Sequence, residues 1–206
     1  MNRTIKSALI VVAIILGLCG VATSQTQKGE VDDPFAGVVY GNDPNPKEIV
    51  RLRGRVSQGD VSALELLADH YSMGVGVKKN NKEAARLRGL AAAKGRVDAQ
   101  TKLAWMYRIG EGVAQNYREA MRLYRLAAAQ GDQHAMIELG WLYSEGKAVP
   151  RDFVRSHMWY NLGSVSEISS GSTNRSDIEA KMTPAQIAEA QAMARKCQAS
   201  NFKQCD

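Results

Sequence analysis

Histidine and cysteine are scarce in this 206-residue chain, which has three of each. The histidines, His70, His134 and His157, show no H-x3-H spacing, and no C-x2-C pair occurs. Zinc sites commonly use such closely spaced ligand pairs, so the sequence argues against a metal centre. No glycine-rich phosphate loop follows a predicted strand, which argues against a bound nucleotide. We therefore predict no metal, no cofactor and no catalytic residue, and a protein that is not an enzyme.

Long hydrophobic runs are also missing, apart from one short run near the N-terminus. Residues 8–18 are apolar without interruption, and Arg3 and Lys6 precede them. The run is short for a membrane-spanning helix, which needs about 20 residues, but it is typical of an export signal. Small residues one and three positions before Gln25 predict cleavage there, so residues 1–24 are a predicted signal peptide. The alternative is an uncleaved signal that anchors the chain in the inner membrane.

The chain is basic, and its predicted export limits the kinds of partner that this charge could attract. Loss of residues 1–24 removes two basic residues and lowers the formal net charge from +6 to +4. The mature chain is long enough to bury a core of its own. Its early basic residues form either a solvated helix face or a footprint for an acidic partner or anionic lipid. Nucleic acid is not expected as a partner of an exported protein. The early basic residues are Arg51, Arg53, Arg55, Lys78, Lys79, Lys82, Arg86 and Arg88.

A repeat with a period of 36 residues occupies the middle of the chain. A repeat of this length indicates two-helix units, which stack because one unit cannot bury its apolar face alone. We predict an all-α fold: an α-solenoid of stacked helix pairs near residues 62–94, 98–130 and 134–165, closed by a C-terminal capping helix. The repeated columns include Ala63, Ala99 and Ala135; Leu67, Leu103 and Leu139; Tyr71, Tyr107 and Tyr143; and Gly74, Gly110 and Gly146.

Each repeat carries signals for where its helices begin and end. A glycine-rich turn ends the first helix, since glycine adopts a positive φ at little cost. Asn80, Asn116 and Asp152 occupy one repeat column and are predicted N-caps of the second helices. Small residues on both helices allow the paired helices to approach closely. They are Ala68, Ala104 and Gly140 on the first helices, and Ala91, Ala127 and Gly163 on the second.

Two segments lie between the predicted signal peptide and the C-terminal region. Residues 25–47 contain three prolines and no helical period, which predicts a flexible linker. Residues 48–166 hold the three repeats and, before them, a half-repeat helix. The half-repeat sequence EIVRLRG echoes EAARLRG in the second helix of the first repeat. Such atypical terminal units are common in repeat arrays, where they cover the open end of the stack.

The C-terminal region, residues 167–206, is predicted to be a loop followed by a capping helix and a tail. Residues 166–176 are rich in Ser, Gly, Thr and Asn, which favours a loop. Thr183 and Gln186 are spaced as a capping box at the start of the last helix. That helix is expected to cover the last open apolar face of the stack.

The repeat columns A-x3-L-A-x2-Y-x2-G-x-G-V, then N and A-x2-L-x3-A, resemble the Sel-one-like repeat family, a relative of the tetratricopeptide repeats. The resemblance implies an α-solenoid that serves as a binding scaffold, and it brings no shared catalytic residues. The run MTPAQIAEAQ also resembles the closing helix of bacterial members, so a periplasmic or secreted bacterial protein is expected. In the middle repeat the columns are Ala99, Leu103, Ala104, Tyr107, Gly110, Gly112, Val113, Asn116, Ala120, Leu123 and Ala127.

Two functions agree with these expectations. The first is an exported, non-catalytic scaffold, an envelope adaptor or host-contact factor, that binds a protein or peptide through its solenoid surface without stable membrane insertion. The alternative is a β-lactamase-like hydrolase of the cell envelope. Cysteine-rich relatives of the family are linked to β-lactam binding, and S-x-x-K strings begin at Ser144 and Ser200. Those relatives carry cysteine pairs within each repeat, and this chain has none there. We therefore favour the scaffold.

The predicted partner-binding residues lie on the outer side of the first helices. The residue two after the recurrent leucine lies about 200° around the helix from the buried stripe. This column holds Asp69, Trp105 and Trp141, and Arg108 and Ile137 are expected on the same face. By analogy with tetratricopeptide arrays this face is concave, and tryptophan is enriched at binding hot spots. The alternative is that each tryptophan packs on the adjacent repeat and only stiffens the stack.

Cys197 and Cys205 are the two cysteines that remain after signal removal. An oxidising compartment favours their pairing, so we predict a disulfide that fastens the tail to the capping helix. Pairing with another chain is the alternative.

Overall fold

A computed structural model describes residues 46–164 and 169–205 of the chain. These two ranges form nine α-helices and contain no strand, which confirms the predicted all-α class. Within them, no helix has both the length and the apolar character that a membrane span requires. The predicted signal peptide and nearly all of the predicted linker lie outside the described residues.

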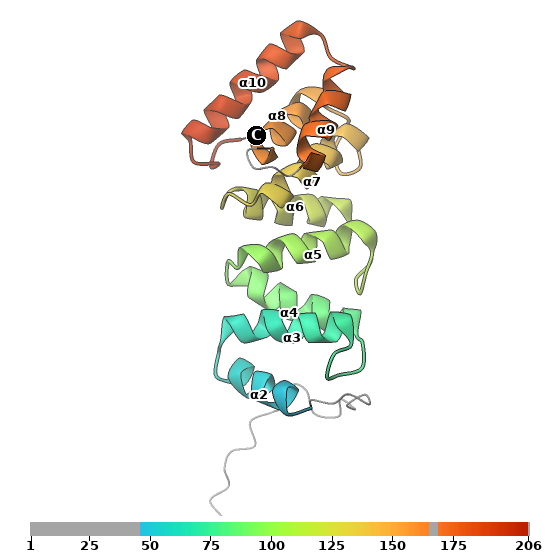
Figure 1. Cartoon of the computed structure of the whole chain (residues 1–206), viewed down its shortest axis with the longest axis vertical. Helices are drawn as coiled ribbons and strands as arrows, with labels where there is room; N and C mark the ends of the chain where they lie inside the picture. Colours follow the sequence, from blue (N-terminus) through green and yellow to red (C-terminus); the bar gives the residue numbers. More distant parts are fainter. Residues whose placement is uncertain (1–45, 165–168, 206) are drawn as a thin grey trace, which may run out of the picture. The chain divides into compact units, whose positions relative to one another are not determined.

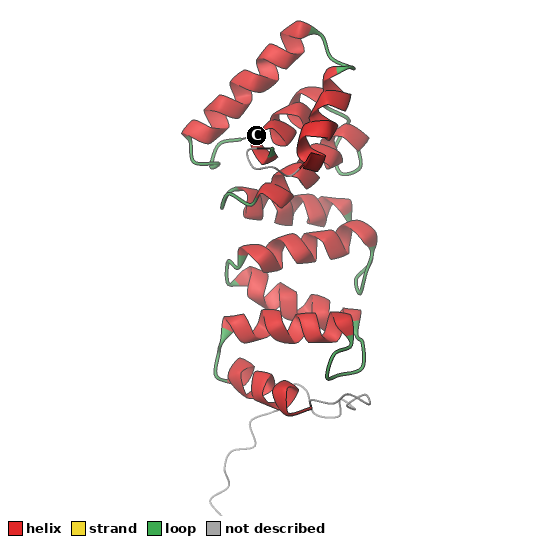
Figure 2. Ribbon diagram, viewed as in Figure 1, coloured by secondary structure: helices red, strands yellow, loops and turns green. Residues whose placement is uncertain are grey.

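Six helices form three pairs, one pair for each repeat (Figure 1). Each helix contacts the next along the chain, within a pair and between pairs, so the array is an α-solenoid. Loops join these six helices, as Figure 2 shows. The pairs are α3 (Val61–Met73) with α4 (Asn81–Ala93), α5 (Val97–Ile109) with α6 (Tyr117–Ala128), and α7 (Gln133–Glu145) with α8 (Phe153–Gly163).

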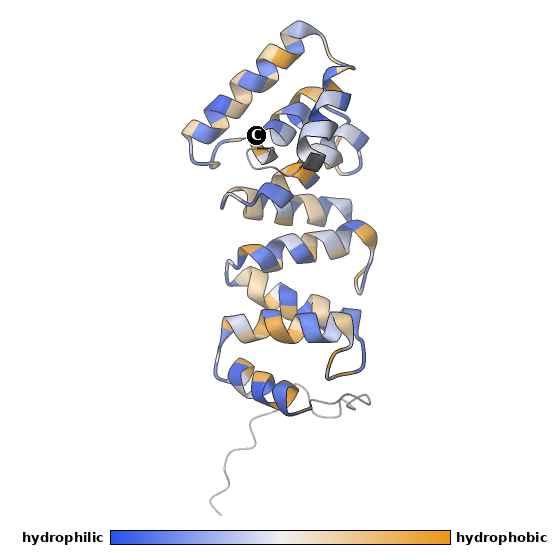
Figure 3. Ribbon diagram, viewed as in Figure 1, coloured by the Kyte–Doolittle hydropathy of each residue, from blue (hydrophilic) through white to orange (hydrophobic). Residues whose placement is uncertain are grey.

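The repeated apolar columns form the core between the helices. Leu67 and Leu139 are fully buried on the first helices, and Leu87 on the second. Burial of a leucine side chain contributes about 1.5–3 kcal/mol, so these columns hold neighbouring repeats together. Figure 3 shows hydrophobic and hydrophilic residues mixed along the repeat helices, as expected for helices with one buried face.

The predicted helix ends are confirmed. Asn80 accepts a hydrogen bond from the Glu83 amide at 3.0 Å, and Asn116 and Asp152 cap α6 and α8 in the same way. Gly74, Gly110 and Gly146 end the first helices in the left-handed conformation. The chain therefore turns at the same point in every repeat.

Helix α2 (Pro46–Ser57) occupies the position of the predicted half-repeat helix and begins two residues before residue 48. It contacts α3, and Ile49 and Leu52 are fully buried there. Arg53 is also buried and donates a hydrogen bond to the Tyr71 hydroxyl at 2.9 Å. The half-repeat thus covers the first full repeat.

The structure differs from the predicted loop over 166–176. Residues from Ser169 onward form α9 (Ser169–Glu179), which contacts α8. Ile178 is buried, and Glu179 lies 2.6 Å from His157 Nε2 on α8. These contacts order a segment that its composition alone would leave as a loop, because most helix stability in proteins comes from tertiary packing.

Helix α10 (Pro184–Ala199) is the predicted capping helix. Thr183 and Gln186 form the predicted capping box, with hydrogen bonds in both directions. Ala190, Ala194 and Cys197 are buried, and the helix contacts α8. Helix α10 therefore covers the second helix of the last repeat.

Candidate functional site

The outer sides of α3, α5 and α7 form a surface that we call the first-helix face. Three inter-repeat ion pairs join it. Arg96 lies 2.8 Å from Glu65, Lys102 lies 3.0 Å from Asp69, and Arg108 lies 3.1 Å from Glu138. Because each pair joins one repeat to the next, the pairs bring side chains of consecutive first helices side by side. The face comprises Glu65, Leu66, Asp69, Met73, Arg96, Lys102, Trp105, Arg108, Ile109, Glu138 and Trp141.

Trp105 is the centre of the most apolar part of this face. Its side chain is 40% exposed, and Ile109, one turn further along α5, is 42% exposed. On α3, Leu66 and Met73 are 46% and 65% exposed. Single exposed apolar residues are ordinary, but these four lie on consecutive first helices that the Lys102–Asp69 ion pair joins, and such a group is typical of an interaction site. We call Leu66, Met73, Trp105 and Ile109 the Trp105 patch.

Sequence reasoning identified Trp105 but missed the other three members of the patch. The signal was present: Leu66 and Met73 are seven residues apart, and Ile109 is four after Trp105. Residues at these spacings share one side of a helix.

Asp69 lies beside the patch and is held by two cations. Its carboxylate accepts hydrogen bonds from Arg88 at 2.8 Å and from Lys102 at 3.0 Å. Burial by itself raises the pKa of this carboxyl, but the hydrogen bonds from Arg88 and Lys102 outweigh burial and leave the pKa lowered. Asp69 therefore stays ionised and connects α3 with α4 and α5.

Trp141 is half-buried and lies under residues of the adjacent repeat. The Arg108 guanidinium is 5.1 Å from the centre of its ring, and the Tyr117 ring is 6.2 Å away. Arg108 also pairs with Glu138, whose pKa is raised by burial although Arg108 opposes the shift. Trp141 thus makes the inter-repeat packing that the alternative interpretation describes, while Trp105 lies exposed.

Ile137 lies apart from the Trp105 patch. A Cβ atom on Gly163 would come within 2.8 Å of Ile137 Cγ1, so the isoleucine packs closely on α8. Its Cδ1 is also near Gly171 of α9. The other predicted residues, Asp69, Trp105, Arg108 and Trp141, are brought together on the first-helix face.

The early basic residues do not form one solvated face. Arg88 is buried, with its guanidinium bonded to Asp69 and close to Met106 Sδ at 3.1 Å. Arg53 is buried against Tyr71. Both arginines therefore contribute to packing between helices, and a solvated-face or partner interpretation applies only to exposed members of the set such as Lys78 and Lys79.

The two S-x-x-K serines are hydrogen-bonded at helix ends. Ser144 is buried, and its hydroxyl donates to the Trp141 carbonyl at 2.9 Å. The Ser200 hydroxyl donates to the Cys197 carbonyl at 2.7 Å. His70 Nδ1 lies 2.7 Å from the Val75 carbonyl. Within the described ranges no three acidic, histidine or cysteine side chains gather as metal ligands would.

Comparisons with known proteins agree with this geometry. The family model described as "Sel1 repeat" matches residues 61–95, 97–132 and 133–164, which together are half of the chain. No curated protein matches the chain.

Two solved structures resemble the described fold. One is a Sel1 repeat protein from Oxalobacter formigenes, with 32% identity and a TM-score of 0.57 over 63% of this chain and 98% of that one. The other is a protective antigen of uropathogenic Escherichia coli with an SLR fold, with 25% identity and a TM-score of 0.57. That match covers 75% of this chain but 42% of the antigen, so this chain spans less than half of the antigen's length. The chain belongs to the Sel1 repeat family.

Proposed function

We propose that the protein is an exported, non-catalytic scaffold that binds a protein or peptide partner through the first-helix face. The observation that carries the proposal is the Trp105 patch, four exposed apolar side chains on two consecutive first helices, α3 and α5. Export rests on the N-terminal sequence, which has the basic start and apolar run of a signal peptide. The similarity to a protective antigen of a pathogenic bacterium supports a host-contact role.

The patch favours an amphipathic helix or extended peptide as the partner. The Asp69–Lys102 ion pair joins the two helices that carry its apolar members, so the surface combines apolar anchors with charged groups. Partner helices bind such surfaces through apolar residues spaced three, four and seven apart. Tryptophan contributes large contact area at low entropic cost, so Trp105 is the expected hot spot.

Site-specific photo-crosslinking in the native cell envelope tests this proposal. A photoreactive residue replaces Ile109 in the patch, and a second variant carries it in place of Leu126 on α6. Leu126 is a matched control, since it is also apolar and 43% exposed but belongs to a second helix. We expect one dominant crosslinked protein from position 109 and none from position 126. Equal crosslinking at both positions would contradict the proposal.

The hydrolase alternative finds no support in the described residues, because both candidate serines are hydrogen-bonded to backbone carbonyls. We expect purified protein to leave a chromogenic β-lactam unchanged. Hydrolysis that is lost on Ser144→Ala or Ser200→Ala would instead identify an enzyme.

A further inference from the structure

Two tyrosines of the repeat column each accept a hydrogen bond from an arginine on the preceding second helix. Arg53 on α2 donates to the Tyr71 hydroxyl at 2.9 Å. Arg125 on α6 donates to the Tyr143 hydroxyl at 2.7 Å. Each arginine stands 18 residues before its tyrosine, and both tyrosines are buried. An arginine–tyrosine pair is therefore a recurrent contact between consecutive repeats.

The middle repeat carries the tyrosine without the arginine. Gly89 of α4 stands 18 residues before Tyr107 and so occupies the position of the two arginines. Tyr107 is only partly buried, and its hydroxyl forms no hydrogen bond with another described residue. Gly89 and Tyr107 line one cavity of about 690 Å³. This volume lies within the range of ligand-binding pockets, roughly 300–1,000 Å³.

A smaller cavity of the same construction lies one repeat later, where the arginine is present. That cavity has a volume of about 370 Å³, and Arg125 and Tyr143 line it. The difference in volume is expected where a long side chain replaces a glycine. We call the larger cavity the Gly89 slot. Its lining positions with counterparts 36 residues later are Gly89, Tyr107, Val113, Ala114, Gln115 and Asn116.

The local structure does not require a glycine at position 89. Gly89 lies inside α4 and is absent from the glycines with a positive φ. A Cβ atom added there would have Leu103 Cδ2 as its nearest neighbour outside the backbone of α4, at 4.0 Å. Glycine inside a helix destabilises it relative to most other residues. Gly89 thus lowers stability and keeps the slot open, a combination that is common where function opposes stability.

The walls of the Gly89 slot match an arginine side chain. Ala85, Leu103 and Val113 are apolar and would pack against its methylene groups. Tyr107 offers an aromatic ring, on which a guanidinium can stack, and a hydroxyl that can accept its hydrogen bond.

The basic residues of the slot do not exclude an arginine. Arg86 is paired with Glu83 at 2.7 Å, and Lys82 is exposed to solvent, which screens its charge. The positions equivalent to Lys82 and Arg86 in the next repeat are both arginines, and Arg125 still donates to Tyr143 there.

We propose that the Gly89 slot binds an arginine side chain of a peptide or protein partner, whose guanidinium donates to the Tyr107 hydroxyl. The bound arginine would complete in the middle repeat the contact that Arg53 and Arg125 make in its neighbours. The slot shares no residue with the Trp105 patch. The proposal therefore goes beyond the proposed scaffold function, and either can fail without the other.

NMR titration of the purified, isotope-labelled protein tests the proposal. The probe is a blocked Ala-Arg-Ala tripeptide, and a blocked Ala-Lys-Ala tripeptide carries the same charge without a guanidinium. We expect the arginine peptide to shift the amide signals of Gly89 and Tyr107 and to bind several-fold more tightly than the lysine peptide, because a planar guanidinium stacks on the ring. Free arginine distinguishes the source: binding tighter than that of the peptide would assign the slot to a small guanidinium compound and overturn the peptide partner.

A variant that fills the slot from within locates the site. Gly89→Arg supplies the missing arginine, so the affinity for the arginine peptide should fall by tenfold or more while the melting temperature rises. Gly54→Arg is the matched control, since Gly54 lies inside α2 and no heavy atom lies within 4 Å of its Cβ position. It adds the same charge and the same gain in helix propensity, and peptide affinity should stay within about twofold.

Two further variants test the chemistry of the slot. Tyr107→Phe removes the acceptor hydroxyl but keeps the ring, and peptide affinity should fall by roughly tenfold. Lys82→Gln removes a cation, so the affinity for the arginine peptide should rise by up to about twofold, whereas an anion site would lose affinity. The proposal is overturned if the arginine peptide causes no shifts, if the lysine peptide binds equally well, or if Gly89→Arg leaves the affinity unchanged.

Discussion

Replacing Gly112 with alanine tests the contact that joins the first two repeats. Gly112 lies in the loop between α5 and α6 and has a φ of +73°. A Cβ atom there would lie 2.1 Å from the carbonyl oxygen of Asn81 and 2.4 Å from its carbonyl carbon, at the start of α4. Favourable contacts between heavy atoms need roughly 3.5 Å, and backbone atoms cannot rotate away as a side chain can. The loop or the helix must therefore move.

Two costs add at this position. The left-handed conformation costs an alanine about 1–2 kcal/mol, and overpacking typically costs a further 1–3 kcal/mol. The loop also contributes the hydrogen bond from Asn81 to Glu111 at 2.7 Å, which the displacement would weaken. We expect Gly112→Ala to lower the free energy of unfolding by about 2–5 kcal/mol, measured by urea denaturation followed by circular dichroism.

Gly131→Ala is the matched control for this prediction. Gly131 has a φ of +88°, but no heavy atom lies within 4 Å of the position that its Cβ would take. It should therefore show the conformational cost alone, about 1–2 kcal/mol. The difference between the two variants corresponds to roughly 2–12 °C in melting temperature for a domain of this size. Equal destabilisation by the two variants would refute the close contact between repeats.

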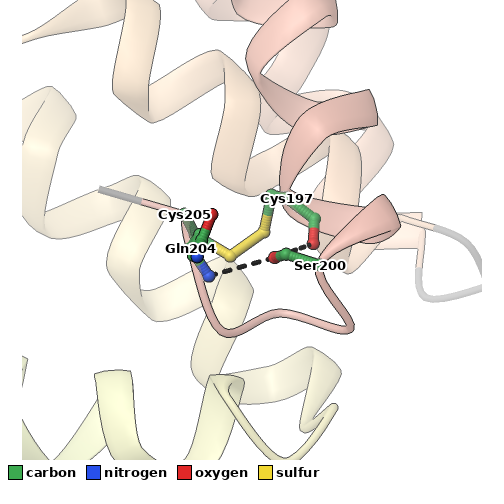
Figure 4. Close-up of a disulfide and its surroundings, with 4 residues drawn as sticks. All are labelled: Cys197, Ser200, Gln204 and Cys205. Atoms are coloured by element: carbon green, nitrogen blue, oxygen red, sulfur yellow. Dashed lines mark hydrogen bonds between the residues drawn. A yellow bond between two sulfur atoms is a disulfide. The ribbon is translucent and has the colours of Figure 1, made fainter.

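Three further predictions concern other parts of the structure. Gly140→Ala should lower the free energy of unfolding by about 1–3 kcal/mol, because the added Cβ would lie 2.7 Å from the Tyr160 ring. The other two repeats carry alanine at this position. Urea denaturation measures the change, and an unchanged free energy would show that the ring shifts freely. Unreduced native protein should contain no free thiol at Cys197 or Cys205, which the structure joins as a disulfide (Figure 4). Replacing both with serine should lower the free energy of unfolding by roughly 2–3 kcal/mol at most, because the loop is short. Two thiols in a labelling assay would disprove the pairing, and a reducible dimer would indicate that each cysteine pairs with another chain. The pKa of Asp69 is lowered in the folded protein, so its contribution to stability is present above the ordinary pKa of 3.8 and is lost as the pH falls through the lower folded value. The difference in free energy of unfolding between wild type and Asp69→Asn should therefore be constant near neutral pH and shrink below about pH 4. A difference that grows in acid would contradict this expectation.

Most of the fold could be predicted from the sequence because the same apolar positions and helix-end residues recur in all three repeats. The 36-residue register located the six repeat helices, and local chemistry located their ends at Asn80, Asn116 and Gly110. Each of these signals involves residues only a few positions apart, so the sequence alone is enough to predict the helix ends. Helix α9 was missed because its order depends on Ile178 and on contacts with α8, and its Ser- and Gly-rich composition indicates the opposite.

The candidate surface could be predicted only in part. A helical wheel identifies the side of α5 on which Trp105 lies, but it says nothing about what covers Trp141. Arg108 and Tyr117 cover that ring from the neighbouring repeat, and the exact rotation of stacked helices decides whether they can reach it.

The most direct test of the proposed scaffold function uses the partner that is crosslinked at position 109. Its dissociation constant is measured with wild-type protein and with the Trp105→Ala variant, and the two values are compared. Trp105 is 40% exposed, so Trp105→Ala should lower the melting temperature but still fold, which circular dichroism checks before binding is measured. A hot-spot tryptophan contributes about 2 kcal/mol or more to binding, so the dissociation constant should rise by roughly thirtyfold. An unchanged dissociation constant in the folded variant would show that the partner does not bind through the Trp105 patch.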